Sequence, residues 1–415
     1  MARILHVWLR GRLVGELQQD DSGQLRFRYA PEWLSMPDAV PLSVSLPLRP
    51  EVFPRKQCRP FFAGLLPEEA NRELIAKSFG ISKNNDFALL DRIGGECAGA
   101  VSLMPEGAPP TGSDPGSYEP LDEATLARLL AELPKRPLLA GEKGLRLSLA
   151  GAQNKMAVAR TESGYALPLN GAPSTHILKP PSPHFAGLIE NECFCMKLAA
   201  AIGLNVAAVR IAQAQDSPFL EIERYDRRHL PDGTVERLHQ EDFCQALGVV
   251  PELKYQAEGG PGLKRCFELV RSVSSVPAVD LLRLFDAVVF NYLIGNSDAH
   301  GKNFSLLYDG REIRLAPLYD LVCTQAYPEL SRTMAMKLGG ERDPASVMPR
   351  NWRKFADEAG LGQPVALRRI TGLTQQVLDA VETLASDFGT VNQASAVVRI
   401  NCARALAIGG SAGRK

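Results

Sequence analysis

The segment Asn296-Ser-Asp-Ala-His-Gly-Lys-Asn-Phe304 combines acidic, amide and basic side chains at a spacing that could do chemistry. Asp298 is followed five residues later by Asn303, and Lys302 lies between them. An Asp in such a loop can accept the proton of a substrate hydroxyl, while the Asn reaches a magnesium ion on nucleotide phosphates. A lysine between them can offset charge on a transferring phosphoryl group. The spacing therefore predicts the catalytic loop of a phosphotransferase.

A second acidic residue strengthens this prediction. Asp320 ends the segment Ala316-Pro-Leu-Tyr-Asp320, which follows a short predicted strand at residues 313–315. A hairpin there would return the chain to the loop and supply a second metal-binding carboxylate. Taken singly, Asp298 could be a turn residue at a helix end and Asp320 a turn or N-cap residue. The joint spacing with Asn303 favours a magnesium–nucleotide site.

A lysine for the nucleotide phosphates is expected on a strand earlier in the chain. The β-prone run Thr175-His-Ile-Leu-Lys179 ends at Pro180 and suits that role. Lys179 could also be an exposed lysine on an edge strand. Glu192, on the helix that follows, could pair with Lys179 or could be a solvated carboxylate on a helix face.

A loop that covers the phosphates should precede this lysine, yet the chain has neither GxGxxG nor GxxxxGK[ST]. The segment Leu147-Ser-Leu-Ala-Gly-Ala-Gln-Asn-Lys155 offers small residues whose backbone N–H groups could approach phosphate, and Lys155 adds charge. A plain hairpin turn is the alternative. The segment from Glu221 to Arg228 ends a predicted strand between the two predicted lobes. It could be a hinge that binds adenine, or an ordinary charged strand end.

The elements that must position these loops change character along the chain. Alternation with period two predicts an antiparallel meander over residues 4–29, and a proline-rich loop at 41–60 precedes helical residues 61–93. The Pro- and Gly-dense stretch 105–116 predicts a linker. Further strands are expected at 145–149, 155–159, 175–179, 206–212, 218–224, 313–315 and 333–337, and further helices at 122–133, 190–202, 279–294, 351–360, 364–386 and 393–408.

This order predicts an α+β, two-lobed protein-kinase-like fold with an extra N-terminal α/β subdomain and an all-helical C-terminal lobe. The expected domains are an N-terminal mixed subdomain (1–106), a strand-rich lobe with the phosphate loop and Lys179 (121–240), a helical lobe with the catalytic and metal-binding loops (241–408) and a flexible tail (409–415).

Charge and cysteine content narrow the class of protein further. Lys plus Arg and Asp plus Glu both number 47, so the net charge is zero. That balance argues against a protein that binds nucleic acid by itself, although a basic partner could hold the chain on DNA. The eight cysteines form no CxxC pair, which favours reduced thiols in a cytoplasmic protein. No signal peptide or apolar run of ~18 residues is present, so no membrane role is expected.

Taken together, five ordered motifs resemble the HipA family, the serine/threonine kinase toxins of bacterial toxin–antitoxin modules. These motifs are Ser148-Leu-Ala-Gly-Ala-Gln-Asn-Lys155, Thr175-His-Ile-Leu-Lys179, Glu223-Arg-Tyr-Asp-Arg-Arg228, Asp298-Ala-His-Gly-Lys-Asn303 and Tyr319-Asp320. Three N-terminal segments also match the family, namely Tyr29–Trp33, Pro41–Pro47 and Phe61–Pro67.

The resemblance implies ATP and Mg²⁺ as cofactors, Asp298 as the catalytic residue, and Asn303 and Asp320 as the magnesium ligands. It implies that Ser148 is autophosphorylated, which switches the enzyme off by displacing the phosphate loop. The ATP-binding residues implied by the family are Ala150, Gly151, Ala152, Gln153, Asn154, Lys155, Lys179, Glu223, Arg224, Tyr225, His300, Lys302, Asn303, Tyr319 and Asp320.

The resemblance also implies two partners. One is a small dimeric helix-turn-helix antitoxin that binds operator DNA and holds the kinase inactive, so that contact with DNA is indirect. The other is a protein substrate of the aminoacyl-tRNA synthetase class.

Two other functions remain open at this point. A small-molecule kinase would keep Asp298, Asn303 and Asp320 but would not need the N-terminal subdomain or Ser148. A catalytically weak corepressor scaffold for the antitoxin would need none of these residues, and their joint presence with Lys179 argues against it.

Overall fold

The computed structural model describes residues 3–108, 117–388 and 391–410, so most of the predicted linker and residues 411–415 of the predicted tail lie outside the described residues. The chain divides into two compact units. The first unit comprises Met1–Pro180, Ala212–Glu252 and Leu306–Ile313, and the second comprises Pro181–Ile211, Leu253–Ser305 and Arg314–Lys415. Within the described residues, none of the helices is both long enough and apolar enough to cross a membrane.

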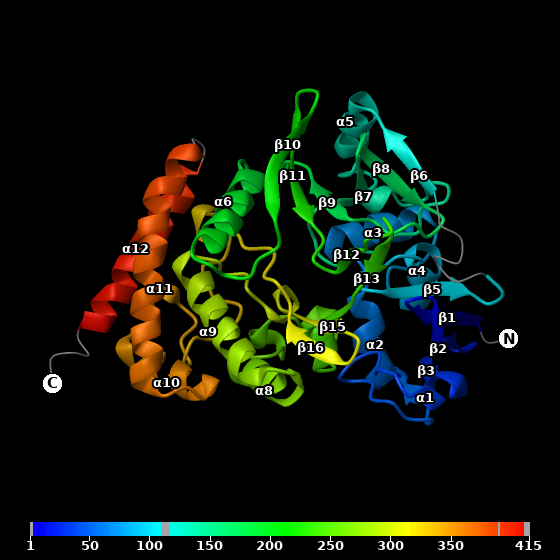
Figure 1. Ribbon diagram of the computed structural model, residues 1–415, viewed down its shortest axis with the longest axis horizontal. Coiled ribbons are helices and arrows are strands. Elements are labelled where there is room, and N and C mark those ends of the chain that lie inside the picture. The colour runs from blue at the N-terminus through cyan, green and yellow to red at the C-terminus, as the bar shows by residue number, and fades with distance from the viewer. Residues whose placement is uncertain (1–2, 109–116, 389–390, 411–415) are drawn as a thin grey trace. The chain divides into compact units, whose positions relative to one another are not determined.

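The first unit opens with a five-stranded sheet of order β4-β3-β2-β1-β5 (Figure 1). Its strands are β1 (Arg3–Leu9), β2 (Arg12–Gln19), β3 (Leu25–Tyr29), β4 (Phe53–Pro54) and β5 (Val101–Pro105). The alternation seen in the sequence buries every second side chain, including Leu5, Val7 and Leu9. The predicted antiparallel meander is confirmed.

Four helices accompany this sheet, namely α1 (Pro31–Ser35), α2 (Arg55–Gly64), α3 (Glu69–Ser78) and α4 (Asp86–Ile93). Helix α2 begins at Arg55, inside the stretch that the prolines predicted to be loop. Its Phe61 and Phe62 are fully buried, and the Phe62 ring lies 5.3 Å from that of Phe27 on β3. Packing on the sheet therefore overrides the local proline signal.

A second sheet of six strands has the order β10-β11-β9-β7-β8-β6. Its strands are β6 (Ser117–Leu121), β7 (Met156–Thr161), β8 (Gly164–Leu169), β9 (His176–Lys179), β10 (Val209–Ala214) and β11 (Ser217–Glu223). Helix α5 (Glu123–Glu132) begins after Asp122, whose carboxylate accepts the N–H of Thr125. The predicted strand that carries Lys179 is confirmed as β9, an inner strand of this sheet.

Smaller elements complete the β content. The strands β12 (Arg227–His229) and β13 (Val235–Arg237) form a hairpin, and β14 (His239–Asp242), β15 (Ser305–Asp309) and β16 (Glu312–Leu315) form a three-stranded sheet. The short helix α7 (Phe243–Ala246) follows β14. The hairpin of β15 and β16 carries the chain from the catalytic loop to Asp320, as the sequence predicted.

The second unit is built from helices. They are α6 (Leu188–Ala201), α8 (Leu263–Val273), α9 (Pro277–Leu293), α10 (Pro349–Ala359), α11 (Gln363–Leu384) and α12 (Asn392–Gly410). Helices α11 and α12 lie side by side (Figure 1). Helix α12 also backs the end of α9, because Asn401 donates a hydrogen bond to the carbonyl of Tyr292 at 3.3 Å. Gly295, with φ +69°, follows α9, and a Cβ there would lie 2.7 Å from Val397.

Two of the predicted strands are wrong. Residues 145–149 form an extended segment with a single bridge, between Leu147 and Glu96. Leu145, Leu147 and Leu149 alternate because one side of the segment is buried in the apolar core of the first unit, not because it pairs in a sheet. Residues 333–337 likewise form bends, tied to their neighbours by separate hydrogen bonds instead of a ladder.

Candidate active site

The catalytic loop predicted at residues 296–304 follows directly after α9 and contains a short 3-10 turn at Gly301–Asn303. The side-chain amide of Asn303 makes hydrogen bonds in two directions. Its Nδ2 donates to Asp320 Oδ2 at 2.9 Å, and its Oδ1 accepts the backbone N–H of His300 at 3.3 Å. The structure thus brings the predicted Asn and the second Asp into direct contact, within the second unit.

Asp320 reaches this position through an uncommon backbone conformation. Its φ is +57°, the left-handed region, which Asp and Asn tolerate better than other residues with a Cβ. Its neighbour Tyr319 anchors the turn, because the Tyr319 hydroxyl donates to the carbonyl of Lys302 at 2.7 Å and lies 2.7 Å from Ser305 Oγ. Tyr319 therefore ties the second acidic turn to the catalytic loop.

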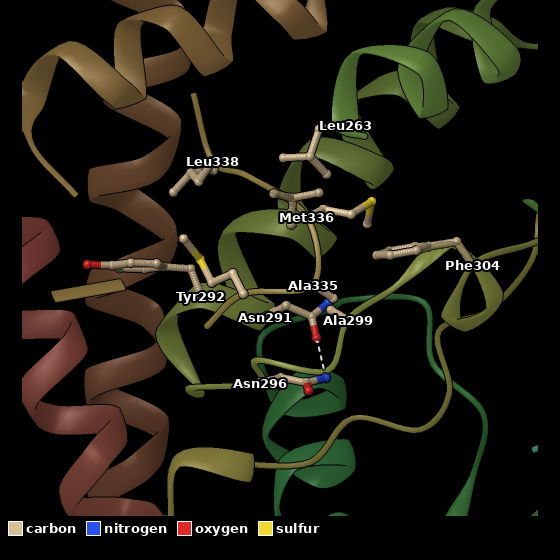
Figure 2. A pocket seen from close by; sticks show the side chains of 11 residues that line it. Leu263, Asn291, Tyr292, Asn296, Ala299, Phe304, Ala335, Met336 and Leu338 are labelled. Atoms are coloured by element: carbon tan, nitrogen blue, oxygen red, sulfur yellow. Dashed lines mark hydrogen bonds between the residues drawn. The ribbon is translucent and has the colours of Figure 1, made fainter. Parts of the chain in front are cut away.

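A chain of amides and hydroxyls supports the loop from the helix side. Asn296 Nδ2 donates to Asn291 Oδ1 at 2.7 Å, as Figure 2 shows, and Asn296 Oδ1 accepts the backbone N–H of Asp298. The N–H of Ser297 donates to Thr324 Oγ1 at 2.8 Å. These bonds fix the backbone on either side of Asp298.

A small cavity of ≈ 30 Å³ lies directly behind the loop (Figure 2). Asn296, Ala299 and Phe304 of the loop line it, and apolar side chains such as Leu263 and Met336 form much of the rest. A space of this size holds about one or two water molecules. The loop is therefore backed by packed side chains and has little room to move inward.

The Asp298 carboxylate is exposed, whereas His300, Lys302 and Asn303 are buried around it. A further residue, which the sequence analysis did not identify, contacts Asp298. The hydroxyl of Tyr255 donates to Asp298 Oδ1 at 2.8 Å. Tyr255 lies in an irregular segment far from the loop in sequence, so no motif spacing pointed to it.

The donor set around Asp320 fits magnesium. One carboxylate and one side-chain amide are oxygen ligands of the kind that Mg²⁺ takes when substrate phosphates and water complete its shell. Within residues 3–108, 117–388 and 391–410, no three His, Cys, Asp or Glu side chains are grouped so as to hold a metal ion alone. Asn303 and Asp320 would therefore hold the metal together with phosphate oxygens.

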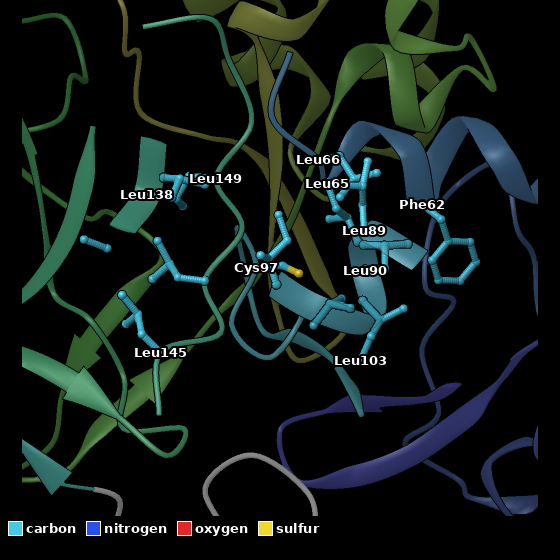
Figure 3. Packing of buried hydrophobic residues seen from close by; sticks show 14 of the residues in the cluster. Phe62, Leu65, Leu66, Leu89, Leu90, Cys97, Leu103, Leu138, Leu145 and Leu149 are labelled. Carbon is cyan, nitrogen blue, oxygen red and sulfur yellow. The ribbon is translucent and has the colours of Figure 1, made fainter. Parts of the chain in front are cut away.

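The predicted phosphate loop lies in the first unit and is held by residues that follow α2 and α4. Ser148 is fully buried, and its Oγ donates to the carbonyl of Leu65 at 2.7 Å. The backbone N–H of Ser148 donates to Glu96 O at 2.8 Å, and the Glu96 N–H donates to Arg146 O. Figure 3 shows Leu145 and Leu149 among the buried apolar side chains that hold this segment.

The tip of the loop carries the small residues that the sequence analysis singled out. Gly151 has φ +108°, and a Cβ there would lie 2.7 Å from Lys155 Nζ, which donates to the carbonyl of Ala150. Within the described residues, Gln153 Oε1 and Asn154 Oδ1 are buried without a hydrogen-bond partner. Rotating either amide by 180° would place an NH₂ donor where the oxygen now lies, and a phosphate oxygen could accept from it. These residues fit a nucleotide phosphate.

The strands β9 and β11 place the next group of predicted residues in register. Lys179 pairs with Leu220, and His176 pairs with Glu223 at the end of β11. Lys179 is buried on an inner strand, so the alternative of an exposed edge-strand lysine is wrong. Glu192 is buried on α6, and its pairing with Lys179 stays a prediction.

The three residues after β11 differ in what their side chains do. Glu223 is exposed, and the half-buried Tyr225 donates its hydroxyl to Gln240 Oε1. Arg224, by contrast, is buried, and its guanidinium bonds Asp226 at 2.8 Å and Ser174 Oγ at 2.8 Å. This side chain anchors the segment, so its predicted contact with adenine would have to come from the backbone.

Arg224 belongs to a buried network of charges within the first unit. Arg227 bonds Glu96 at 2.7 Å, and the same Glu96 oxygen accepts the N–H and the Oγ of Ser174. Burial alone would raise the pKa of Asp226, but the guanidinium groups of Arg224 and Arg227 hold it well below its usual range. The network fixes the end of β11 and the start of β9 against the segment that carries Glu96.

Comparison with known proteins identifies the family. Residues 147–383 match the HipA-like C-terminal domain, and residues 5–104 match the HipA N-terminal domain. The protein Y4mE of Sinorhizobium fredii is 53% identical over 388 residues, covering 93% of this chain and 92% of that protein. The serine/threonine-protein kinase toxin HipA of Shewanella oneidensis is 30% identical over 392 residues, covering 91% and 88%.

A solved structure agrees with these sequence matches. The complex of Shewanella oneidensis HipA and HipB with operator DNA contains a chain that superposes with a TM-score of 0.86 at 28% identity, covering 98% of both chains. The α+β fold is that of a kinase, as the sequence predicted. Within that class, the chain belongs to the HipA family.

Proposed function

We propose that this HipA-family kinase uses ATP and Mg²⁺ to phosphorylate serine or threonine hydroxyls and acts as the toxin of a toxin–antitoxin module. The observation that carries the proposal is the contact of Asn303 with Asp320 at 2.9 Å beside the exposed carboxylate of Asp298. An exposed carboxylate next to a magnesium-type ligand pair can receive both the acceptor hydroxyl and the metal-bound phosphates.

The residues of the second unit would divide the work as follows. Asp298 orients the acceptor hydroxyl and accepts its proton. Asn303 and Asp320 hold Mg²⁺, which neutralises charge on the phosphates when it is bound. Lys302 and His300, both buried beside these ligands, offer donors to the phosphate oxygens, and Tyr319 keeps the two acidic turns together.

In the first unit, the loop from Ala150 to Lys155 and the buried Lys179 would bind the phosphates. Glu223, Tyr225 and the backbone of Arg224 would line the adenine pocket.

Ser148 is proposed as a site of autophosphorylation that inactivates the enzyme. Its hydroxyl is buried against the carbonyl of Leu65, so the loop must leave this position before Ser148 can accept a phosphoryl group. A phosphoserine carries a charge of about −1.5 to −2. Returning that charge to the fully buried position beside the carbonyl of Leu65 would carry a large desolvation cost. Phosphorylation would therefore keep the loop out of place.

We further propose a helix-turn-helix antitoxin as the partner. The Shewanella oneidensis relative forms a complex with HipB and operator DNA, and the zero net charge of the present chain suits DNA binding by a partner. An aminoacyl-tRNA synthetase is the proposed substrate class on the family resemblance alone. The eight cysteines are all buried and free, which suits a reducing compartment, and we propose the cytoplasm.

The test is a phosphorylation assay of the full chain with ATP and Mg²⁺. We expect a gain of one phosphate at Ser148, read by intact mass and phosphopeptide mapping, and no gain with Asp298→Asn or Ser148→Ala. The starting mass shows whether the protein was purified already phosphorylated. An unphosphorylated wild type that gains no phosphate and releases no ADP would refute the proposed kinase activity.

A further inference from the structure

Tyr255 contacts the catalytic carboxylate from outside the catalytic loop. Its hydroxyl donates to Asp298 Oδ1 at 2.8 Å. The rings of Tyr255 and His300 pack edge to face, with their centroids 5.3 Å apart and an angle of 77° between their planes. One aromatic side chain therefore contacts two residues of the loop through two different groups, the hydroxyl and the ring.

The backbone around Tyr255 is bonded to the segment that also holds the catalytic loop. The N–H of Gln256 donates to Ala335 O at 3.2 Å, and the N–H of Ala335 donates to Ser297 O at 2.8 Å. Gln256 Oε1 accepts the N–H of Lys337 at 2.7 Å. Ala335 thus connects the residue after Tyr255 to Ser297, the residue before Asp298. These bonds fix the position of Tyr255 relative to Asp298.

The turn after Tyr255 is closed tightly. The N–H of Gly260 donates to the carbonyl of Tyr255 at 2.9 Å, and a Cβ at Gly260 would lie 2.7 Å from that carbonyl oxygen. On the other side, Lys254 is buried with its Nζ 5.3 Å from the centre of the Tyr255 ring. The backbone of Tyr255 is therefore fixed by the turn, and a cation lies near its ring.

We propose that Tyr255 is a positioning residue for phosphoryl transfer, an inference that rests on the proposed function. Its hydroxyl holds the Asp298 carboxylate in one orientation, from which the carboxylate can receive the acceptor hydroxyl. The acceptor oxygen then forms a bond to the γ-phosphorus of ATP, and the bond from that phosphorus to the β,γ-bridging oxygen breaks. ADP leaves with the electron pair, Asp298 receives the acceptor proton, and Tyr255 keeps its own.

The hydrogen bond between Tyr255 and Asp298 should contribute little to the free energy of unfolding. Asp298 is exposed, and water solvates an exposed carboxylate nearly as well as a tyrosine hydroxyl does. The effect of the hydroxyl should therefore fall on the geometry of the reaction. Loss of a hydrogen bond to a charged, catalytically placed group lowers rates by about 10- to 100-fold.

The experiment compares wild type, Tyr255→Phe and Tyr255→Ala as full chains with ATP and Mg²⁺. Tyr118→Phe is the matched control, because Tyr118 also donates its hydroxyl, to the carbonyl of Pro173, on an exposed strand of the first unit. Two acceptors are followed, namely Ser148 by intact mass and water by ADP release in a Ser148→Ala background. The reaction with water does not require the segment around residue 148 to leave its buried position. The rate of ADP release therefore reports the chemical step without the opening of this loop.

We expect Tyr255→Phe to lower the rate at saturating ATP by about 10- to 100-fold for at least one acceptor, with an unchanged half-saturating ATP concentration and thermal midpoint. Tyr255→Ala should also raise the half-saturating ATP concentration, because the ring no longer supports His300. Rates for Tyr255→Phe within about twofold of wild type for both acceptors would overturn the inference and leave the kinase activity standing. The same holds for a loss seen only in ATP affinity. A wild type inactive with both acceptors would overturn the proposed function together with the inference.

Discussion

Glu241 is a fully buried carboxylic acid on β14 whose ionisation should set a pH dependence of stability. Its Oε1 accepts the N–H of Val44 at 2.9 Å and the hydroxyl of Tyr308, and its Oε2 accepts Ser43 Oγ at 2.5 Å. Burial nevertheless raises the pKa of Glu241 to about 7, against the effect of these hydrogen bonds. We predict that Glu241→Gln removes much of the pH dependence of unfolding between pH 5 and 8.

The sign and the size follow from the pKa. Between the usual value of 4.5 and about 7, folded Glu241 holds a proton that the unfolded chain has released. The free energy of unfolding therefore falls as the pH rises through this window, by about 3 kcal/mol in total. A glutamine at 241 can keep both bonds at Oε1, and its Nε2 can donate to Ser43 Oγ, so the variant should fold in the same way.

The assay is denaturant unfolding of wild type and Glu241→Gln at pH 5 and at pH 8, with the exposed Glu51→Gln as a control for the change of side chain. The stability of Glu241→Gln relative to wild type should be higher at pH 8 than at pH 5 by about 2–3 kcal/mol. All other titrating groups are common to both proteins and cancel in this comparison. A difference below about 0.5 kcal/mol would show that the three hydrogen bonds outweigh the cost of burial, and the reasoning would fail.

Three further substitutions test the site and its supports. Asp320→Asn keeps a residue that tolerates φ +57° but removes the negative charge. The rate of phosphorylation, measured by intact mass, should fall at least ~100-fold with an unchanged thermal midpoint. An active variant would exclude Asp320 as a metal ligand. Asp226→Asn removes one of the negative charges that pair with the buried guanidinium groups of Arg224 and Arg227. The free energy of unfolding, measured in urea, should fall by about 3–5 kcal/mol. A decrease below about 1 kcal/mol would mean that the fold does not depend on the network. Gly151→Ala forces a Cβ into φ +108°, so nucleotide titration should show about tenfold weaker ATP binding, and unchanged binding would place the phosphates elsewhere.

The sequence was most informative where local pattern and tertiary packing agree. The meander from Arg3 to Tyr29, the apolar helix α9 and the strand that ends at Lys179 all occur as predicted. The contact between Asn303 and Asp320 was predicted because spacing within a loop–hairpin–turn unit limits where the two side chains can lie. These features depend on short stretches of chain.

The errors arise where a pattern has two structural explanations. Leu145, Leu147 and Leu149 alternate as in a strand, but the segment packs into a core that includes residues far away in the chain, such as Leu65 and Leu90. The sequence places Asp226 two residues after Arg224, but it could not indicate the second partner of Arg224, Ser174, which lies 50 residues away in the chain. Tyr255 was missed for the same reason, since its hydroxyl meets Asp298 across 43 residues of sequence.

The attachment of the Ser148 segment to Leu65 and Glu96 has a consequence for how the chain can be divided. The two matched family domains, at 5–104 and 147–383, suggest two modules, yet residues of the first form the wall on which the phosphate loop of the second rests. A fragment beginning near residue 110 would lose the carbonyl that receives Ser148 and the backbone that pairs with Leu147. The N-terminal part therefore supports the Ser148 segment directly, and the two matched domains are not structurally independent modules.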